Sequence, residues 1–343
     1  MTGSVEHRAG SVGEGFVPAS SVRDRSSRAT PDFFLVGHPK SGTTALYEML
    51  RRHPQIYMPE LKEPSFLAPD QSRRFQRAGS GPLPGTLEEY LALFEAARPG
   101  QRVGEASSAY LMSQAAPARI AELQPDARIV AILREPASLL RSLHLQLLQD
   151  HVETERSLRR AISLESARRE GRHIPPRSPR PEALQYSERV RFAEQLRRYH
   201  GVFGRERVLV LLYDDFRREN EATVRRVLRF LGVDDDGVDV VGVEANPTVR
   251  VRSQRLDRLV HSVSVGRGPV GRLVKGPVMA LAPRRVRRGV LGAVRTRVVL
   301  ASPPAVDHDL MLELRRRYLP EVLAVSEYLD RDLVSLWGYD RLG

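Results

Sequence analysis

The sequence of 343 residues contains no cysteine and very little lysine. The absence of cysteine excludes disulfide bonds, thiolate catalysis and cysteine-based zinc sites. The nine histidines show no HxH or HExxH grouping, so we expect no metal site. Only Lys40, Lys62 and Lys275 are lysines among 54 basic residues. Since arginine has been used almost everywhere, each remaining lysine is a candidate for a specific role.

Long apolar segments are also missing. No apolar run approaches the roughly 18 to 20 residues that span a bilayer. The N-terminus has charges and glycines where a signal peptide would have an apolar core. We therefore expect a cytoplasmic protein. Residues 1–31 are rich in Gly, Ser, Arg and Asp and are expected to form a disordered tail, followed by a single domain at 32–343.

The charge is unevenly distributed. The net charge is +12, and residues 249–297 carry thirteen basic residues against one acid, so this segment accounts for the whole net charge. Such a balance favours anionic partners. We interpret 249–297 as a basic insertion that is either a solvated surface or a contact for a membrane or another acidic surface. No specific recognition of nucleic acid is expected.

Apolar runs alternate with segments of helical periodicity. The runs at 33–36, 128–133 and 207–213 are typical of buried parallel strands, and a further short strand is predicted at 102–105. Helices are predicted at 44–52, 86–97, 116–123, 136–149, 157–170, 190–199, 220–231 and 307–328. This alternation predicts an α/β domain with one parallel sheet flanked by helices. Residues 171–181 hold four prolines and are expected to form an irregular loop or lid.

A glycine loop follows the first strand. Gly37 to Thr44 read GHPKSGTT and lie between a strand and a helix, where backbone N–H groups form an anion site. The two glycines have the spacing of a Walker A loop, but Thr43 stands where that loop has its lysine, and the lysine is at Lys40. The sequence therefore predicts a P-loop-like fold whose phosphate loop has a relocated cation.

The neighbouring strand does not end in a magnesium-binding acid. The strand at 128–133 leads into Arg134, a cation suited to phosphate, which favours a phosphate-rich ligand bound without metal. Asp214 and Asp215 follow the strand at 207–213 and can supply the missing acid. A P-loop NTPase or kinase-like phosphotransferase therefore stays an alternative, as does a non-catalytic basic module that binds anions.

Two motifs together resemble a known family. FFLVGHPKSGTT at 33–44 resembles the 5'-phosphosulfate loop of sulfotransferases that use 3'-phosphoadenosine 5'-phosphosulfate (PAPS). Arg134-Glu135-Pro136 with Ser142 resembles the 3'-phosphate motif of the same family. The segment KEPSF at 62–66 looks like a segment of the heparan-modifying and bacterial carbohydrate sulfotransferases. The resemblance covers roughly two thirds of the chain.

The resemblance implies an enzyme that moves a sulfuryl group from PAPS to a hydroxyl or amine of a small-molecule or carbohydrate acceptor, without a metal. Lys40 would be catalytic. The residues that would bind PAPS are Lys40, Ser41, Gly42, Thr43, Thr44, Arg134 and Ser142. Glu63 is the leading candidate for the general base, because it matches the acidic position of the heparan-type segment. Glu105 and then His144 are the alternatives.

Overall fold

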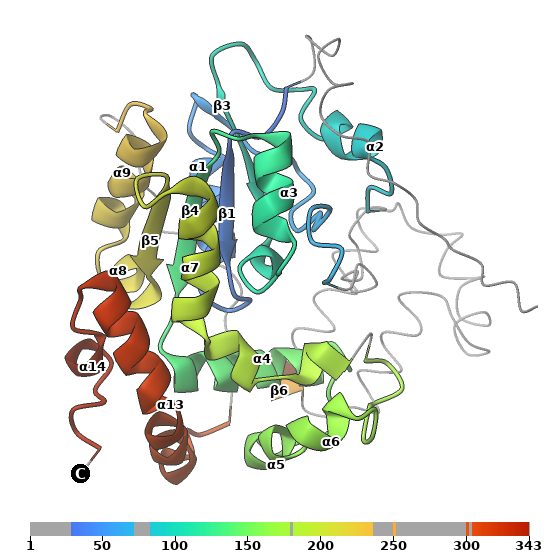
Figure 1. Cartoon of the computed structure of the whole chain (residues 1–343), viewed down its shortest axis with the longest axis vertical. Helices are drawn as coiled ribbons and strands as arrows, with labels where there is room; N and C mark the ends of the chain where they lie inside the picture. The colour runs from blue at the N-terminus through green and yellow to red at the C-terminus, as the bar shows by residue number, and fades with distance from the viewer. Residues whose placement is uncertain are drawn as a thin grey trace, which may run out of the picture.

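A parallel sheet of five strands forms the centre of the molecule (Figure 1). The computed structural model describes residues 29–71, 83–178, 181–235, 250–251, 300–301 and 304–342. The strands are β1 (Phe33–Gly37), β2 (Ile56–Tyr57), β3 (Arg102–Ala106), β4 (Arg128–Leu133) and β5 (Val208–Leu212), in the order β2-β3-β1-β4-β5. The predicted parallel α/β sheet is confirmed. The tail at 1–28 and nearly all of 249–297 lie outside the described residues.

Helices follow the strands in the predicted alternation. They are α1 (Thr43–Leu50), α2 (Leu87–Ala92), α3 (Ala116–Leu123), α4 (Pro136–Gln149), α5 (Leu158–Ser163), α6 (Glu165–Arg169), α7 (Phe192–Phe203), α8 (Tyr213–Arg218), α9 (Asn220–Leu231), α13 (His308–Leu329) and α14 (Leu333–Leu336). Short 3-10 turns are η2 (Ser108–Tyr110), η3 (Pro181–Leu184) and η4 (Ser187–Val190), and β6 (Arg250–Val251) pairs with β7 (Leu300–Ala301). The helix predicted at 157–170 is wrong in detail, since Leu164 separates α5 from α6.

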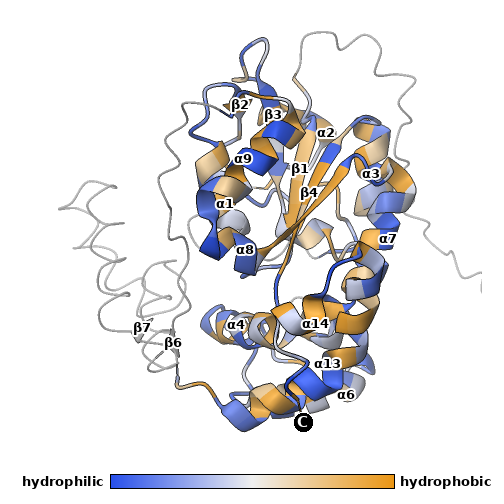
Figure 2. Cartoon of the chain, turned by 90° about the vertical axis from the view of Figure 1, so that its left-hand side faces the viewer, coloured by the Kyte–Doolittle hydropathy of each residue, from blue (hydrophilic) through white to orange (hydrophobic). Residues whose placement is uncertain are grey.

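The sheet is buried on both faces, which explains the continuous apolar runs of its strands. Phe33 and Leu35 of β1 pack in one cluster with side chains of α1 and α9, whereas Phe34 and Val36 pack in the other with α3, α7 and α13. This alternation is the two-residue period of a strand. Figure 2 shows the apolar strands enclosed by helices on either side.

The start of α4 is fixed by Glu135. Its carboxylate accepts hydrogen bonds from the N–H groups of Ala137 (3.2 Å) and Ser138 (2.7 Å), and Pro136 occupies the first helical turn. This is a helix N-cap with proline in the position that tolerates it. The hydroxyl of Tyr339 also donates to Glu135 Oε1 over 2.9 Å. The C-terminal segment is therefore attached to the end of the sheet where β4 leads into α4.

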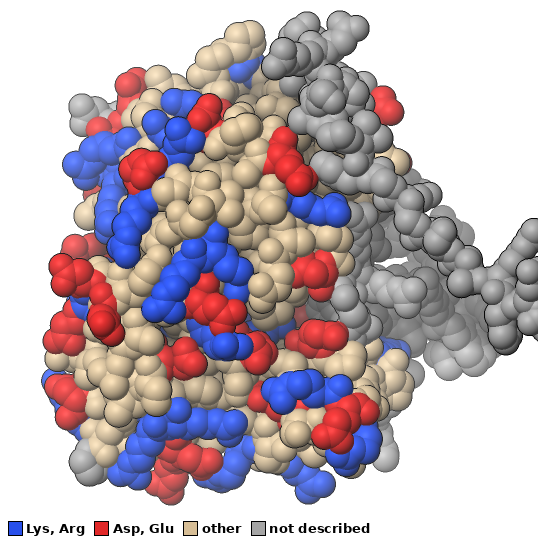
Figure 3. All heavy atoms as spheres, viewed as in Figure 1, with Lys and Arg blue, Asp and Glu red and all other residues tan. Residues whose placement is uncertain are grey.

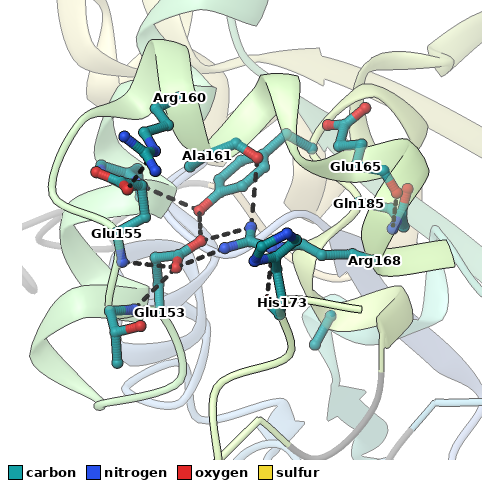
Figure 4. Close-up of polar contacts among 12 residues, drawn as sticks. Glu153, Glu155, Arg160, Ala161, Glu165, Arg168, His173 and Gln185 are labelled. Carbon is teal, nitrogen blue, oxygen red and sulfur yellow. Dashed lines mark hydrogen bonds and ion pairs between the residues drawn. The ribbon is translucent and has the colours of Figure 1, made fainter. Parts of the chain in front are cut away.

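A buried ion pair anchors the irregular region between α4 and α7 (Figure 4). Arg168 donates to both carboxylate oxygens of Glu153, over 2.7 and 2.8 Å, and the two side chains are 1% and 0% exposed. Arg168 Nε also donates to the backbone oxygen of His173 (3.3 Å). The pair thus holds the beginning of the proline-rich segment, of which residues 179–180 are not described. Its role as a lid stays a prediction.

The described surface is mixed in charge. Figure 3 shows Lys and Arg side chains interspersed with Asp and Glu on one face. This agrees with the balance of charge outside residues 249–297. In the part of the chain that the structure describes, no helix combines the length and the apolar character needed to cross a bilayer.

Candidate functional site

The glycine loop leaves β1 at its carboxyl end and turns into α1. Lys40 (φ 74°) and Gly42 (φ 91°) both have left-handed backbone conformations. A Cβ at Gly42 would lie 3.0 Å from Cδ2 of Tyr213 and 3.3 Å from Cδ1 of Phe216. Glycine is therefore required at this position both for its φ angle and for space. The result is a tight turn whose backbone lies directly against α8.

The loop offers donors to an anion. Ser41 is fully buried, and its hydroxyl has no hydrogen-bond partner among the described residues. An unpaired buried hydroxyl is costly unless a ligand satisfies it. The first turn of α1, which begins at Thr43, carries no acidic residue, so the positive end of the helix dipole is not neutralised there. These observations fit a site for a phosphate group at Ser41, Gly42, Thr43 and Thr44.

Arg134 lies beside this loop because β4 pairs in parallel with β1, with Ile132 opposite Gly37. Its Nη1 donates to the backbone oxygen of Lys40 over 2.5 Å, and its guanidinium lies 4.6 Å from the ring centroid of Tyr213. Burial lowers the pKa of Arg134 from its usual value, while Tyr213 and Asp214 oppose that change. The structure thus brings together the two predicted phosphate motifs. Ser142 is buried on α4, the helix that follows Arg134.

The two acids that left the magnesium-dependent alternative open both bind other side chains of the protein. Asp214 and Asp215 lie in the first turn of α8 rather than on a strand end. Asp214 accepts a hydrogen bond from the indole N–H of Trp337 (3.0 Å), and Asp215 from Arg331 (2.6 Å). Among the described residues, no group of three or more potential metal ligands is found. The geometry therefore does not favour the NTPase alternative.

Glu63 lies against the end of β3, where its backbone N–H donates to the oxygen of Ala106 over 3.0 Å. Its Oε2 accepts hydrogen bonds from the backbone N–H (2.7 Å) and the hydroxyl (3.0 Å) of Ser108. Its Oε1 is 2.6 Å from Nζ of Lys62. The side chain is 37% exposed, so an acceptor can reach it. The carboxylate is therefore both fixed and accessible.

Glu105, the second candidate for the base, is enclosed by the protein. It is fully buried on β3, and its Oε2 accepts hydrogen bonds from the hydroxyls of Tyr90 (2.8 Å) and Tyr110 (2.6 Å). Burial raises its pKa to about 7, against the lowering effect of hydrogen bonds from Ser107 and both tyrosines. A carboxylate enclosed in this way cannot contact an acceptor directly. The strand was too short to show which of its faces carries Glu105.

His144, the third candidate for the base, is buried, and so is His38 of the glycine loop. His144 is 3% exposed, with Nδ1 2.9 Å from the hydroxyl of Tyr186 and Nε2 3.2 Å from the backbone oxygen of Arg156. Burial lowers its pKa. His38, 1% exposed, is bound to Gln195 over 2.8 Å, and burial with a contribution from Arg189 lowers its pKa to about 3. Both rings serve as neutral packing groups and are poorly placed as bases.

Some neighbours of the site escaped sequence reasoning. Ser107 and Ser108 directly follow β3, and Tyr213 directly follows β5. Each lies just beyond the carboxyl end of a parallel strand, where ligand sites of α/β sheets form. That rule was the available signal. It accounts for the candidates named after β1, β4 and β5, and it would also have identified Tyr213 after β5 and the serines after β3.

Comparisons with known proteins agree with this geometry. A family model described as "Sulfotransferase family" matches residues 31–237, which is more than half of the chain. A solved structure described as a sulfotransferase from Alicyclobacillus acidocaldarius is 29% identical, with a TM-score of 0.61, and the match covers 90% of this chain and 99% of that one. The likeness therefore extends beyond the loop motifs to most of the fold.

Curated relatives match over shorter stretches. Heparan sulfate glucosamine 3-O-sulfotransferase 6 of Homo sapiens is 31% identical over 132 residues, which is 38% of this chain and 33% of that protein. Heparan sulfate glucosamine 3-O-sulfotransferase 3A1 of Mus musculus is 32% identical over 116 residues, 34% of this chain and 26% of that protein. The chain thus matches only about a third or less of the length of these relatives.

Proposed function

Because the chain belongs to the sulfotransferase family, we propose that it transfers the sulfuryl group of PAPS to a hydroxyl or amine of a small-molecule or carbohydrate acceptor. The family identified from the sequence motifs is confirmed by the family match. The observation that supports the choice of donor is the contact of Arg134 with the backbone of Lys40. It places a cation from the β4 end beside the phosphate loop, as a ligand with two separate phosphates would require.

Different residues of the chain would bind the two phosphate groups of PAPS. The buried hydroxyl of Ser41 and the N–H groups at the start of α1 would hold the 5'-phosphate, and Arg134 with Ser142 would hold the 3'-phosphate. PAPS, when bound, supplies an activated sulfuryl group whose leaving group is a phosphate. Lys40 would place a compact positive charge near the loop, where negative charge develops during transfer. No metal is needed for this division of roles.

Glu63 is proposed as the general base. It would accept the proton of the acceptor hydroxyl as the acceptor oxygen bonds to sulfur. Among the three candidates it is the exposed one, at 37%, whereas Glu105 and His144 are buried. Positioning of the reactants and stabilisation of charge would provide most of the rate enhancement, because the protein forms no covalent bond to the substrate in an in-line displacement.

A carbohydrate acceptor is supported by the relatives, whose names refer to glucosamine of heparan sulfate. Because the chain matches only about a third or less of the length of these relatives, the proposal extends to the class of acceptor and not to a particular sugar. The basic segment 249–297 is proposed to contact an acidic surface, such as a membrane or an anionic polymer. A cytoplasmic location is likewise proposed, as expected from the sequence.

Thermal melting with nucleotides tests the proposal. The product nucleotide 3'-phosphoadenosine 5'-phosphate, in the presence of EDTA, should raise the melting temperature, whereas ATP with magnesium should have a much smaller effect. At about 100 times its dissociation constant a ligand adds about 2.7 kcal/mol of stability. The Arg134→Ala variant should lose most of the rise in melting temperature that 3'-phosphoadenosine 5'-phosphate causes. The control Arg207→Ala, which removes an exposed ion pair with Asp126, should show the same rise as the parent protein. Equal stabilisation by both nucleotides would contradict the proposal.

A further inference from the structure

Two serines that follow β3 hold the segment that carries Glu63. We infer that Ser108 is a positioning residue for sulfuryl transfer, which binds Oε2 of Glu63 so that Oε1 is the oxygen that accepts the proton of the acceptor. This inference rests on the proposed role of Glu63 as the base. Neither the family motifs nor the sequence analysis assigned a role to Ser108.

The hydrogen bonds distinguish the two oxygens of the carboxylate. Oε2 accepts two hydrogen bonds from Ser108, from N–H at 2.7 Å and from the hydroxyl at 3.0 Å. A carboxylate oxygen has two lone pairs in its plane, so Oε2 is fully used. Oε1 accepts one hydrogen bond, from the ammonium of Lys62 at 2.6 Å. One lone pair of Oε1 therefore remains for an acceptor hydroxyl.

The backbone around Glu63 is held in a conformation that it would not adopt alone. Glu63 (φ 63°) and Ser65 (φ 49°) both have left-handed conformations, each of which costs on the order of 1 kcal/mol or more for a residue with a Cβ. The N–H of Glu63 donates to Ala106 (3.0 Å), and the N–H of Ser65 donates to the hydroxyl of Ser107 (3.0 Å). The end of β3 thus supplies the contacts that offset this cost.

Exposure separates the positioning group from the reacting group. Ser108 is 5% exposed, whereas the Glu63 side chain is 37% exposed. A hydroxyl that is buried cannot itself bind the acceptor, but it can fix the direction in which the carboxylate presents Oε1. Because the Ser108 hydroxyl bonds to a charged group, its loss is expected to matter more than the loss of an ordinary hydrogen bond.

The experiment compares Ser108→Ala with Ser108→Thr and with Ser163→Ala. Ser163 is an exposed serine whose hydroxyl bonds only to the backbone of its own helix turn, at Arg160. Ser108→Ala should lower kcat about tenfold while KM for the acceptor and the affinity for 3'-phosphoadenosine 5'-phosphate stay within about twofold. Ser108→Thr, which retains a hydroxyl, should recover most of kcat. Ser163→Ala should have the kcat of the parent enzyme.

A double-mutant cycle with Glu63→Gln tests whether Ser108 acts through Glu63. In the Glu63→Gln background, Ser108→Ala should lower kcat by less than about twofold. An equal loss in both backgrounds, or a parent kcat for Ser108→Ala, would overturn the inference. A parent kcat for Glu63→Gln would instead overturn the proposed base. If Ser108→Ala does not fold, Ser108→Cys replaces it with the same expectations, because a thiol fills similar space and donates weakly.

Discussion

The guanidinium of Arg134 donates a hydrogen bond to the backbone oxygen of Lys40 over 2.5 Å. This contact connects two segments that are 94 residues apart in the sequence. It also holds the carbonyl of Lys40, a residue with a left-handed φ of 74°, toward the end of β4. A change at either residue should therefore affect the phosphate loop as a unit.

Lys40 is expected to be needed for turnover. Lys40→Ala should lower kcat by about 10²- to 10³-fold, the usual cost of losing a group that stabilises developing negative charge. Lys40→Arg should recover little, because a forked guanidinium does not replace a compact ammonium in a tight loop. Lysine, alanine and arginine all carry a Cβ, so the parent and both variants share the same backbone strain and differ only in the side chain beyond Cβ. Near-parent kcat for Lys40→Arg would mean that Lys40 is only a general anion contact.

Glu63→Gln should separate binding from chemistry. The amide keeps the shape of the side chain but cannot accept a proton, so kcat should fall about 10²- to 10⁴-fold. The stabilisation by 3'-phosphoadenosine 5'-phosphate should be unchanged. The fall in kcat should be smaller with phenolic acceptors than with alcohols, since phenolic hydroxyls are already acidic. Equal losses for both classes of acceptor would argue against proton transfer to Glu63.

Gly42→Ala should weaken both the fold and the nucleotide site. The new Cβ would meet Tyr213 at 3.0 Å and would be strained by a φ of 91°. Gly100→Ala is the matched control, because Gly100 has a φ of 83° but no atom within 4 Å of the added Cβ. The control should lose about 1 to 2 kcal/mol from backbone strain alone. Chemical denaturation should show a larger loss for Gly42→Ala, and nucleotide affinity should fall only there.

Arg168 is expected to be essential for stability. Arg168→Met leaves the carboxylate of Glu153 buried without its cationic partner, which should cost about 3 to 5 kcal/mol in the free energy of unfolding. Arg159→Ala removes an ion pair with Glu313 of the same 2.7 Å length, but its side chains are 53% and 50% exposed. That control should lose no more than about 1 kcal/mol. Similar losses in the two variants would show that burial is not the deciding factor.

Glu105 should make stability depend on pH. Its folded-state pKa of about 7 lies above the usual value of 4.5, so between these pH values the folded protein holds a proton that the unfolded chain has released. Stability from this group should therefore fall as pH rises from 4.5 to 7, by about 3 kcal/mol in total at about 1.36 kcal/mol per unit. Glu105→Gln keeps an oxygen for both tyrosines and cannot ionise.

Unfolding free energies of the parent and of Glu105→Gln, measured at several pH values from 4 to 8, check this prediction. The difference between them should grow in favour of the Gln variant across that window. A constant difference would mean that Glu105 does not change its ionisation on unfolding there.

The sequence predicted the strands correctly where they are long and buried on both faces of the sheet. Such strands read as continuous apolar runs, and the parallel arrangement then places the loop after β1 beside the residue after β4. The two-residue strand β2 carried no such signal, and α8 was missed because Tyr213 appeared to extend the apolar run at 207–213. Helix α2 was predicted too long, since it ends at Ala92.

The acceptor side of the site could be predicted only in part. Glu63 was identified from a motif, but its contact with Ser108 spans 45 residues of sequence and depends on the left-handed turn at Glu63 itself. Sequence periodicity contains no information about such a turn in a residue other than glycine. The burial of Glu105 likewise depends on its register opposite Phe34, which is a property of the assembled sheet.

Three contacts of the C-terminal segment show which part of the chain supports the site. Tyr339, Trp337 and Arg331 bind Glu135, Asp214 and Asp215, the acids next to the ends of β4 and β5. All three lie about a hundred residues past residue 237, where the family match ends. A shortened protein that stops before residue 331 would lose all three contacts. A domain boundary placed at residue 237, where the family match ends, would therefore leave out residues that contact the acids beside the site.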